Sequence, residues 1–186
     1  DLLNLHDTMI SGKSIVLRAL EPSDIPLMYA WENDIEIWPV SGTLAPFSRH
    51  TMEQFVKTAN QDIYINKQLR LAIDKKPPEG ENTDTIGYLD LFDFDPAHLR
   101  AGVGILVAKK EDRRKGFALE SLNLLSGYAF NVLNLHQLYC HVHVNNEASI
   151  RLFSAAGYKC NGELTDWTLS NGNWVSVYFM QKINHR

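Results

Sequence analysis

The order of apolar and polar residues divides the chain into short strands and longer helices. Residues 137–144 alternate between an apolar side and a side of polar or aromatic residues. This period of two predicts a strand with one buried face, made by Leu138, Cys140, Val142 and Val144. Shorter apolar stretches predict further strands at residues 15–20, 69–73, 85–94, 101–108, 158–164 and 174–181.

A different period marks the helices. After residue 117 apolar residues recur at intervals of four and three, which places them on one face of a helix. These residues are Ala118, Leu122, Leu125, Ala129 and Val132. Further helices are predicted after polar start signals at residues 21–24, at Ser48 and at Asn146, and Gly157 is expected to end the last one.

Helices that interleave with a mostly antiparallel set of strands predict an α+β fold, or α/β in looser usage. Residues 1–13 show no clear period and are expected to form an N-terminal tail. Residues 14–186 are expected to form one domain, because a chain of 186 residues suits a single core.

Composition narrows the classes of function. The chain is 45% hydrophobic and 22% charged, which is typical of a soluble globular protein. A net charge of −4 and a pI near 6.0 disfavour nucleic-acid binding. No apolar run is long enough for a membrane span, and no signal peptide is visible, so a cytoplasmic location is expected. Cys140 and Cys160 are expected to be buried free thiols in a reducing compartment.

The segment Arg113–Ala118 is a basic turn that contains a glycine and opens the clearest helix. The first N–H groups of a helix lack partners within it, and the helix dipole adds partial positive charge there. Together they form an anion site, which Gly116 opens to a closely approaching ligand. The run from Lys109 to Lys115 holds five positive and two negative residues. This turn predicts a diphosphate ligand, and the plainer alternative is a solvated loop with a helix cap.

Two glycines interrupt the strand that precedes this turn. Gly102 and Gly104 lie inside residues 101–108. Glycine within a strand suggests a bulge or the close approach of another backbone. A tight corner of the sheet is the alternative.

Arg113–Ala118 also reads Arg-x-x-Gly-x-Ala, and the chain later carries Asn146, Ser149 and the pair Gly157-Tyr158. In this order the two segments resemble the acetyl-CoA signature of the GNAT superfamily of N-acetyltransferases. The resemblance covers residues 15–181. It implies acetyl-CoA as the cofactor and a splayed, mostly antiparallel sheet of about six or seven strands flanked by about four helices.

The resemblance also implies which residues hold the coenzyme. Free backbone groups of the strand would pair with the pantetheine arm, as an added strand does, and a nearby N–H would stabilise an oxyanion. The turn would bind the diphosphate, and the last helix would contact the arm. The residues implied are Ile105, Leu106, Val107, Arg113, Arg114, Lys115, Gly116, Phe117, Ala118, Asn146, Ser149 and Phe153.

Phe153 departs from the family pattern. Many members carry Tyr at this position, as the acid that protonates the leaving thiolate. Phe cannot donate a proton, so another group acts or the thiolate leaves unassisted, which a thiol pKa near ~8.5 makes tolerable. Tyr139 and Tyr158 are possible donors, although a structural role is the plainer interpretation of each.

Acidic residues are the candidates for binding and deprotonating the amine that accepts the acetyl group. An amine with a pKa near ~10.4 must lose a proton before it attacks, so a carboxylate must take that proton directly or through water. Asp90 is the first candidate and Glu32 the second, and exposed surface charges are the alternative interpretation. On an extended strand Asp93 and Asp95 are expected on the face opposite Asp90. The residues expected to bind a cationic amine are Glu32, Asp34, Glu36, Asp90 and Asp93.

A metal site is not expected. His141 and His143 share one face of a strand, but no third ligand lies near them in the sequence, and a structural zinc site needs four.

Within the superfamily, residues 31–34, 90–96 and 133–138 look like those of bacterial diamine (spermidine/spermine) N-acetyltransferases, and a small polyamine is the favoured acceptor. Residues 116–120 and 148–149 also fit ribosomal-protein N-terminal acetyltransferases. A CoA-binding sensor without activity is an open alternative. A nucleotide-binding module is disfavoured, because the chain lacks the full sequence run of a P-loop. The expected partner is a small-molecule amine, without nucleic acid or membrane, and a homo-oligomer is compatible with the sequence.

Overall fold

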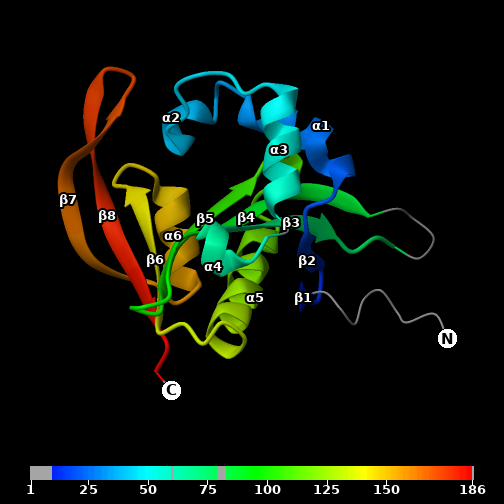
Figure 1. Ribbon diagram of the computed structural model, residues 1–186. Coiled ribbons are helices and arrows are strands. Elements are labelled where there is room, and N and C mark those ends of the chain that lie inside the picture. Colours follow the sequence, from blue (N-terminus) through cyan, green and yellow to red (C-terminus); the bar gives the residue numbers. More distant parts are fainter. Residues whose placement is uncertain (1–9, 60, 79–82, 186) are drawn as a thin grey trace.

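Eight strands form one sheet in the computed structural model, which describes residues 10–59, 61–78 and 83–185. Their spatial order is β1-β2-β3-β4-β5-β6-β8-β7 (Figure 1). The strands are β1 (Ile10–Ser11), β2 (Ile15–Ala19), β3 (Leu69–Lys75), β4 (Asp84–Asp95), β5 (Arg100–Val107), β6 (Gln137–His143), β7 (Lys159–Ser170) and β8 (Asn173–Ile183).

Helices cover both faces of this sheet (Figure 1). They are α1 (Ile25–Glu32), α2 (Trp38–Ser41), α3 (Arg49–Ala59), α4 (Ile63–Asn66), α5 (Phe117–Asn131) and α6 (Glu147–Ala155), with 3-10 turns η2 (Pro22–Asp24) and η3 (Lys110–Asp112). No helix in the described ranges is both long and apolar enough to cross a membrane.

Neighbouring strands of the sheet are antiparallel except for β5 and β6. A parallel pair needs a crossover connection, and α5 supplies it on one face of the sheet. In the β5–α5–β6 unit, residues 108–116, which include η3, connect the end of β5 to the start of α5. This position matters because the basic turn lies between them.

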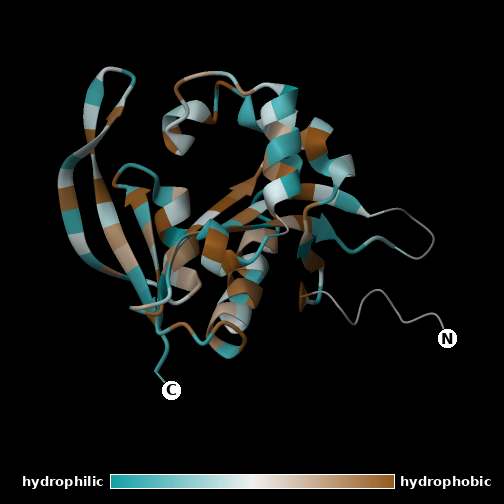
Figure 2. Cartoon of the chain, viewed as in Figure 1, coloured by the Kyte–Doolittle hydropathy of each residue, from teal (hydrophilic) through white to brown (hydrophobic). Residues whose placement is uncertain are grey.

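Two clusters of buried side chains hold the layers together. The larger cluster packs α5 and α6 against one face of the sheet and includes Leu89, Leu122 and Leu138. The smaller cluster packs α1 and α3 against the other face, and it is made by Leu20, Met28, Met52, Val56, Ala72 and Tyr88. Figure 2 shows apolar residues concentrated in the central strands and α5, whereas β7 and β8 carry mixed residues.

The α+β class and the main elements predicted from the sequence are confirmed. The strand and helix counts are higher than expected, because the short elements β1, α2 and α4 have too few residues to show a period. Residues 1–9 of the expected tail lie outside the described part of the chain. Ile10–Ser11, also expected in the tail, pair with β2.

Two smaller expectations are wrong. Val132 does not belong to the buried face of α5, because the helix ends at Asn131 and the Val132 side chain is exposed. Cys160 is exposed, whereas Cys140 is buried as expected. Burial raises the pKa of the Cys140 thiol to about 12, so this side chain is an inert part of the core.

Candidate active site

β5 and β6 diverge after a short paired stretch. Their pairing covers only Arg100–Gly102 of β5 and Gln137–Tyr139 of β6. Beyond Gly102, β5 is paired with β4 alone among the described strands, as far as Val107. The N–H and C=O groups of residues 103–106 that face β6 are thus available, whereas the Val107 carbonyl accepts from Arg113. An extended ligand can pair with the available groups as an added strand does. The predicted splay of the sheet is present at the predicted strand.

The turn after β5 ends in a left-handed residue that starts α5. Arg114 has φ 61° and Gly116 has φ 85°, and Gly116 is the N-cap of α5. No described side chain caps this helix, whose first hydrogen bond runs from Glu120 N to Gly116 O. The earlier N–H groups of the helix lack helical partners, and a Cβ placed on Gly116 would meet nothing within 4 Å. This open, uncapped helix start fits a diphosphate.

The basic side chains of the run are less available than their number suggests. Lys109 is paired with Asp84, and Lys110 is paired with Glu36 at 3.0 Å. The Arg113 guanidinium donates to the carbonyls of Val107 and Ala108 at 3.0 and 3.3 Å. Among the basic residues of this run, only Arg114 and Lys115 make no hydrogen bond or ion pair through their side chains within the described residues. An anion at this turn would therefore depend mainly on the backbone N–H groups rather than on a surplus of basic side chains.

Buried charges fix the turn in place. The carboxylate of Asp112 in η3 is 1% exposed and accepts from Lys75 Nζ at 2.9 Å, and the same ammonium lies 3.1 Å from Asp84. The hydrogen bonds to Asp112 and Asp84 raise the pKa of Lys75, and the hydrogen bond from Lys109 lowers the pKa of Asp84. These pairs tie η3 to β3 and to the start of β4.

The two candidate catalytic carboxylates meet at one guanidinium. Arg70 of β3 is directly opposite Asp90 of β4, donating from Nε to Oδ1 at 2.7 Å and from Nη2 to Oδ2 at 2.9 Å. Its Nη1 also donates to Glu32 Oε1, at the end of α1. One positive charge between two carboxylates leaves a net negative charge, which suits a cationic acceptor.

Aromatic rings enclose this guanidinium. Arg70 Cζ lies 5.1 Å from the ring centroid of Phe55 and 5.0 Å from that of Tyr88. Burial opposes the charge on Arg70, but Asp90 and Glu32 outweigh it and raise the pKa of the guanidinium. Arg70 therefore stays charged and holds the two carboxylates in a fixed geometry.

Asp90 lies beside the diverging strand. It is opposite Gly104 of β5, two residues past the last pairing between β5 and β6. A Cβ on Gly104 would lie 3.9 Å from both Asp90 Cβ and the Phe92 ring, which is ordinary van der Waals contact, so a small group has room over this glycine between the two side chains. An amine placed over Gly104 would adjoin both the carboxylate and the unpaired stretch of β5.

The other predicted acidic residues do not join this group. Asp34 accepts from the backbone N–H of Glu36, and Glu36 pairs with Lys110. Asp95 accepts from the backbone N–H groups of Ala97 and His98 in the turn after β4. Of the expected acidic pocket, the structure brings only Glu32 and Asp90 together.

Asp93 shows why the strand reasoning failed at this point. Its φ of 47° is left-handed, and the register between β4 and β5 shifts between Phe92 and Asp95. Because β4 is not extended there, simple alternation does not apply across Asp93. The expectation that Asp93 and Asp95 share the face opposite Asp90 therefore has no structural basis.

The predicted residues of α6 have local roles. The Asn146 side chain accepts from Ser149 N at 3.1 Å and caps the helix, and Gly157 ends it with φ 91°. Phe153 is 4% exposed and packs edge-on against Tyr158, with ring centroids 5.0 Å apart. Burial raises the pKa of the Tyr158 hydroxyl. Tyr158 is therefore poorly placed to donate a proton to a leaving group.

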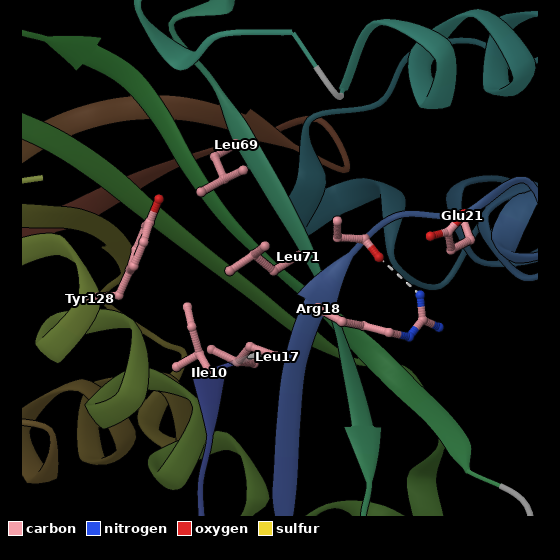
Figure 3. A pocket seen from close by; sticks show the side chains of 8 residues that line it. Ile10, Leu17, Arg18, Glu21, Leu69, Leu71 and Tyr128 are labelled. Carbon is pink, nitrogen blue, oxygen red and sulfur yellow. Dashed lines mark hydrogen bonds between the residues drawn. The ribbon is translucent and has the colours of Figure 1, made fainter. Parts of the chain in front are cut away.

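Two further features, the histidine pair considered for a metal and a pocket beside α5, lie apart from this site. His143 Nε2 lies 3.1 Å from Thr168 Oγ1, and the described residues contain no group of three or more His, Cys, Asp or Glu side chains arranged to hold a metal. A pocket of about 360 Å³ lies between β2, β3 and α5, where Leu17, Leu69 and Leu71 face Tyr128 (Figure 3).

Sequence reasoning missed Arg70. The signal was present, because an arginine inside the apolar strand 69–73 needs a buried partner. That Asp90 is this partner depends on the register of β3 and β4, which one sequence does not provide.

Comparisons with known proteins agree with this geometry. A family model described as "Acetyltransferase (GNAT) domain" matches residues 14–159. The spermidine N(1)-acetyltransferase of Vibrio cholerae is 28% identical over 166 residues, which cover 89% of this chain and 91% of that protein. The enzyme of the same name from Escherichia coli K12 is 26% identical over 181 residues, covering 96% and 90%.

A solved structure extends the similarity to the fold. The crystal structure of spermidine N-acetyltransferase from Vibrio cholerae in complex with CoA and spermine matches with a TM-score of 0.79 and 27% identity. The match covers 91% of this chain and 95% of that one.

The fold is that of an acyl-transfer enzyme. The chain belongs to the GNAT acetyltransferase family. It is an N-acetyltransferase, and acetyl-CoA is its acyl donor. The enzyme class and the cofactor expected from the sequence are thereby confirmed.

Proposed function

We propose that this enzyme acetylates a primary amine of a small polyamine or diamine. Support comes from the relatives named spermidine N(1)-acetyltransferase and from the net negative group of Glu32, Arg70 and Asp90. The observation that carries the proposal is the position of Asp90 opposite Gly104, at the point where β5 and β6 diverge.

The coenzyme, when bound, supplies the activated acetyl group. The N–H groups at the start of α5 and the Gly116 turn are assigned to its diphosphate, and the unpaired stretch of β5, including Ile105 and Leu106, to its extended arm. The Val107 carbonyl already accepts from Arg113, so Arg113 acts by holding the end of β5.

Asp90 and Glu32 are assigned different roles toward the acceptor amine. Both oxygens of Asp90 accept from Arg70, so Asp90 attracts and orients the ammonium beside Gly104. Glu32 accepts from Arg70 through Oε1, and its Oε2 makes no hydrogen bond within the described residues. That oxygen is free to take the acceptor's proton through water. The order expected from the sequence, Asp90 before Glu32, is reversed here for proton transfer.

The test is release of free CoA thiol from acetyl-CoA with a panel of acceptors. Spermidine, spermine and a diamine are compared with a monoamine of similar alkyl length and with peptides that have free N-termini. We expect kcat/KM to be about tenfold or more higher for the polyamines, a difference of about 1.4 kcal/mol. Preference for the peptides would instead support a protein N-terminal acetyltransferase.

A CoA-binding sensor is the second candidate, and the buried Phe153 favours it because no acid stands at that position. Tight binding of CoA without turnover of any amine would support the sensor and contradict the proposed activity. Turnover of any amine in the panel removes it.

A further inference from the structure

A series of aromatic side chains extends from the point where β5 and β6 diverge, on the face of the sheet that carries Asp90. We call Phe92, Tyr139, Phe179, His141 and Trp167 the aromatic row. Ring centroids are 6.3 Å apart for Phe92 and Tyr139, 5.7 Å for Tyr139 and Phe179, and 5.4 Å for Phe179 and His141. The row ends with His141 and Trp167, 6.3 Å apart. Its members come from four strands, β4, β6, β8 and β7, and the row also passes over β5.

The row begins at the candidate active site. Phe92 is two residues beyond Asp90 on the same face of β4, and its ring covers Gly102, where a Cβ would overlap it. Because Gly102 has no side chain, Phe92 reaches across β5 to Tyr139, the last residue of β6 that pairs with β5. Phe92 is thus both a neighbour of Gly104 and the first member of the row.

An irregularity in β7 places the other end. The register between β7 and β8 shifts between Leu164 and Thr168, and Asp166 has φ 48°. A bulge of this kind turns the next side chain, and the Trp167 ring lies beside that of His141, tilted by 48°, while remaining 56% exposed. The Trp167 ring therefore extends the row and is open to solvent.

A carboxylate accompanies the row near its start. Asp93 is exposed, and within the described residues its side chain makes no ion pair or hydrogen bond. Asp93 directly follows Phe92, whose ring centroid lies 6.3 Å from that of Tyr139. Burial raises the pKa of Tyr139, and the charge of Asp93 raises it further. Arg100 and Asp95, the other charges acting on Tyr139, pair with each other at 3.2 Å. Among the charged residues that act on Tyr139, Asp93 alone makes no ion pair or hydrogen bond through its side chain within the described residues.

His141 does not oppose a cation at neutral pH. Burial lowers the pKa of its imidazole, so the ring is uncharged and contributes an aromatic face. The row then presents π faces next to a free carboxylate. Ammonium groups bind to such faces, and methylene chains pack against them.

We propose that the aromatic row, together with Asp93, binds the distal ammonium group of an acceptor whose reactive amine lies over Gly104. This inference rests on the proposed function and deepens it, because it assigns the part of the site that distinguishes a diamine from a monoamine. Asp90 adjoins the reactive end, and the row binds the remote end. An acceptor without a second cationic group gains no cation–π or ionic interaction from the row and Asp93.

The experiment compares steady-state kinetics for spermidine and for a monoamine of similar alkyl length in two variants. Trp167→Leu removes an exposed ring, and Asp93→Asn removes the charge while keeping a residue that tolerates positive φ. Each is expected to raise the KM for spermidine about three- to tenfold. The kcat, the KM for acetyl-CoA and the kinetics with the monoamine are expected to stay unchanged.

Trp174→Leu is the matched control. Trp174 lies in the same β7–β8 hairpin and is 63% exposed, and in the described part of the chain its ring stacks on no other. It should leave the KM for spermidine unchanged, and Trp167→Phe should retain most of the affinity. Equal effects of Trp167→Leu on spermidine and monoamine, or no effect on either, would overturn the subsite. Failure of the unmutated enzyme to acetylate any polyamine would instead overturn the proposed function.

Discussion

The coenzyme side and the acceptor side of this enzyme are built in different ways. The coenzyme side is a continuous stretch of chain, β5, the turn and the start of α5, and it offers mainly backbone N–H and C=O groups. The acceptor side collects side chains from α1, β3, β4, β6, β7 and β8. Backbone groups are common to all sequences, whereas side chains differ, so binding can be retained on one side while selectivity changes on the other.

The two sides also use charge differently. Around the turn most basic side chains are neutralised by Asp84 and Glu36 or are bound to carbonyl groups, so the anion site depends on the shape of the backbone. On the acceptor side, one arginine between two carboxylates leaves a negative charge in a partly buried position. Substitutions that change shape should therefore affect the coenzyme side, and substitutions that change charge should affect the acceptor side.

The largest effect is expected at Gly116. Gly116→Asp puts a side chain at φ 85° and a negative charge at the proposed diphosphate site. Strain of about 1–2 kcal/mol should lower the stability of the fold. The loss of charge-assisted hydrogen bonds of about 1.5–3 kcal/mol, together with repulsion between the carboxylate and the diphosphate, predicts affinity for acetyl-CoA lowered by about a hundredfold or more. Calorimetric titration measures it, with unfolding followed in parallel.

Gly172→Asp is the control for strain alone. Gly172 has φ 78° in the β7–β8 turn, and a Cβ there meets nothing within 4 Å, as at Gly116. It should lower stability slightly and leave coenzyme affinity intact. Unchanged affinity in Gly116→Asp would show that the turn does not bind the diphosphate.

The next effect tests the acceptor side. Asp90→Asn keeps the shape of the side chain but removes the charge beside Gly104. At the lower end of the range for acid–base and orienting groups, kcat/KM for spermidine should fall about a hundredfold, while affinity for acetyl-CoA stays the same. Asp95→Asn, at the end of the same strand, is the control and should leave turnover within about twofold. A parallel loss of coenzyme affinity in Asp90→Asn would mean that the two sides are not separate.

This contrast explains how far the sequence could be interpreted. The turn before α5 was predictable, because Arg113–Ala118 and the glycines of β5 are local signals that keep their meaning without knowledge of the fold. That this turn binds the diphosphate stays a prediction. Its charges were misjudged, because the partners of Lys109 and Lys110 lie far away in the sequence. On the acceptor side, Asp90 and Glu32 were found as residue types. Their common partner Arg70 and the bulge at Asp93 depend on strand register, which no local pattern encodes.

A third prediction tests whether the acceptor side also stabilises the fold. Arg70→Met leaves Glu32 and Asp90 close together without their cation, and both are about one-fifth exposed. Removing one partner of a largely buried ionic group should lower the free energy of unfolding by about 2–3 kcal/mol, as measured by urea denaturation.

The surface pair of Arg151 and Glu147 on α6 is the control. Their atoms are 3.1 Å apart, but the side chains are 71% and 79% exposed. Arg151→Met should change the free energy of unfolding by less than about 0.5 kcal/mol. If both variants cost the same, the Arg70 group would have no special structural role.

The smallest effect is expected at Phe153, the position where the family resemblance implies a proton donor. Phe153→Tyr restores the hydroxyl implied by the family resemblance, but Phe153 is buried against Tyr158 and a thiol of pKa near ~8.5 leaves without much help. At each pH between 7 and 9, we expect the kcat of Phe153→Tyr to differ from that of the unmutated enzyme by less than about threefold. Tyr158→Phe, which keeps the stacked ring, should leave both kcat and stability nearly unchanged, because the buried hydroxyl contributes little. A tenfold rise in Phe153→Tyr would instead show that the natural enzyme lacks an acid that it could use.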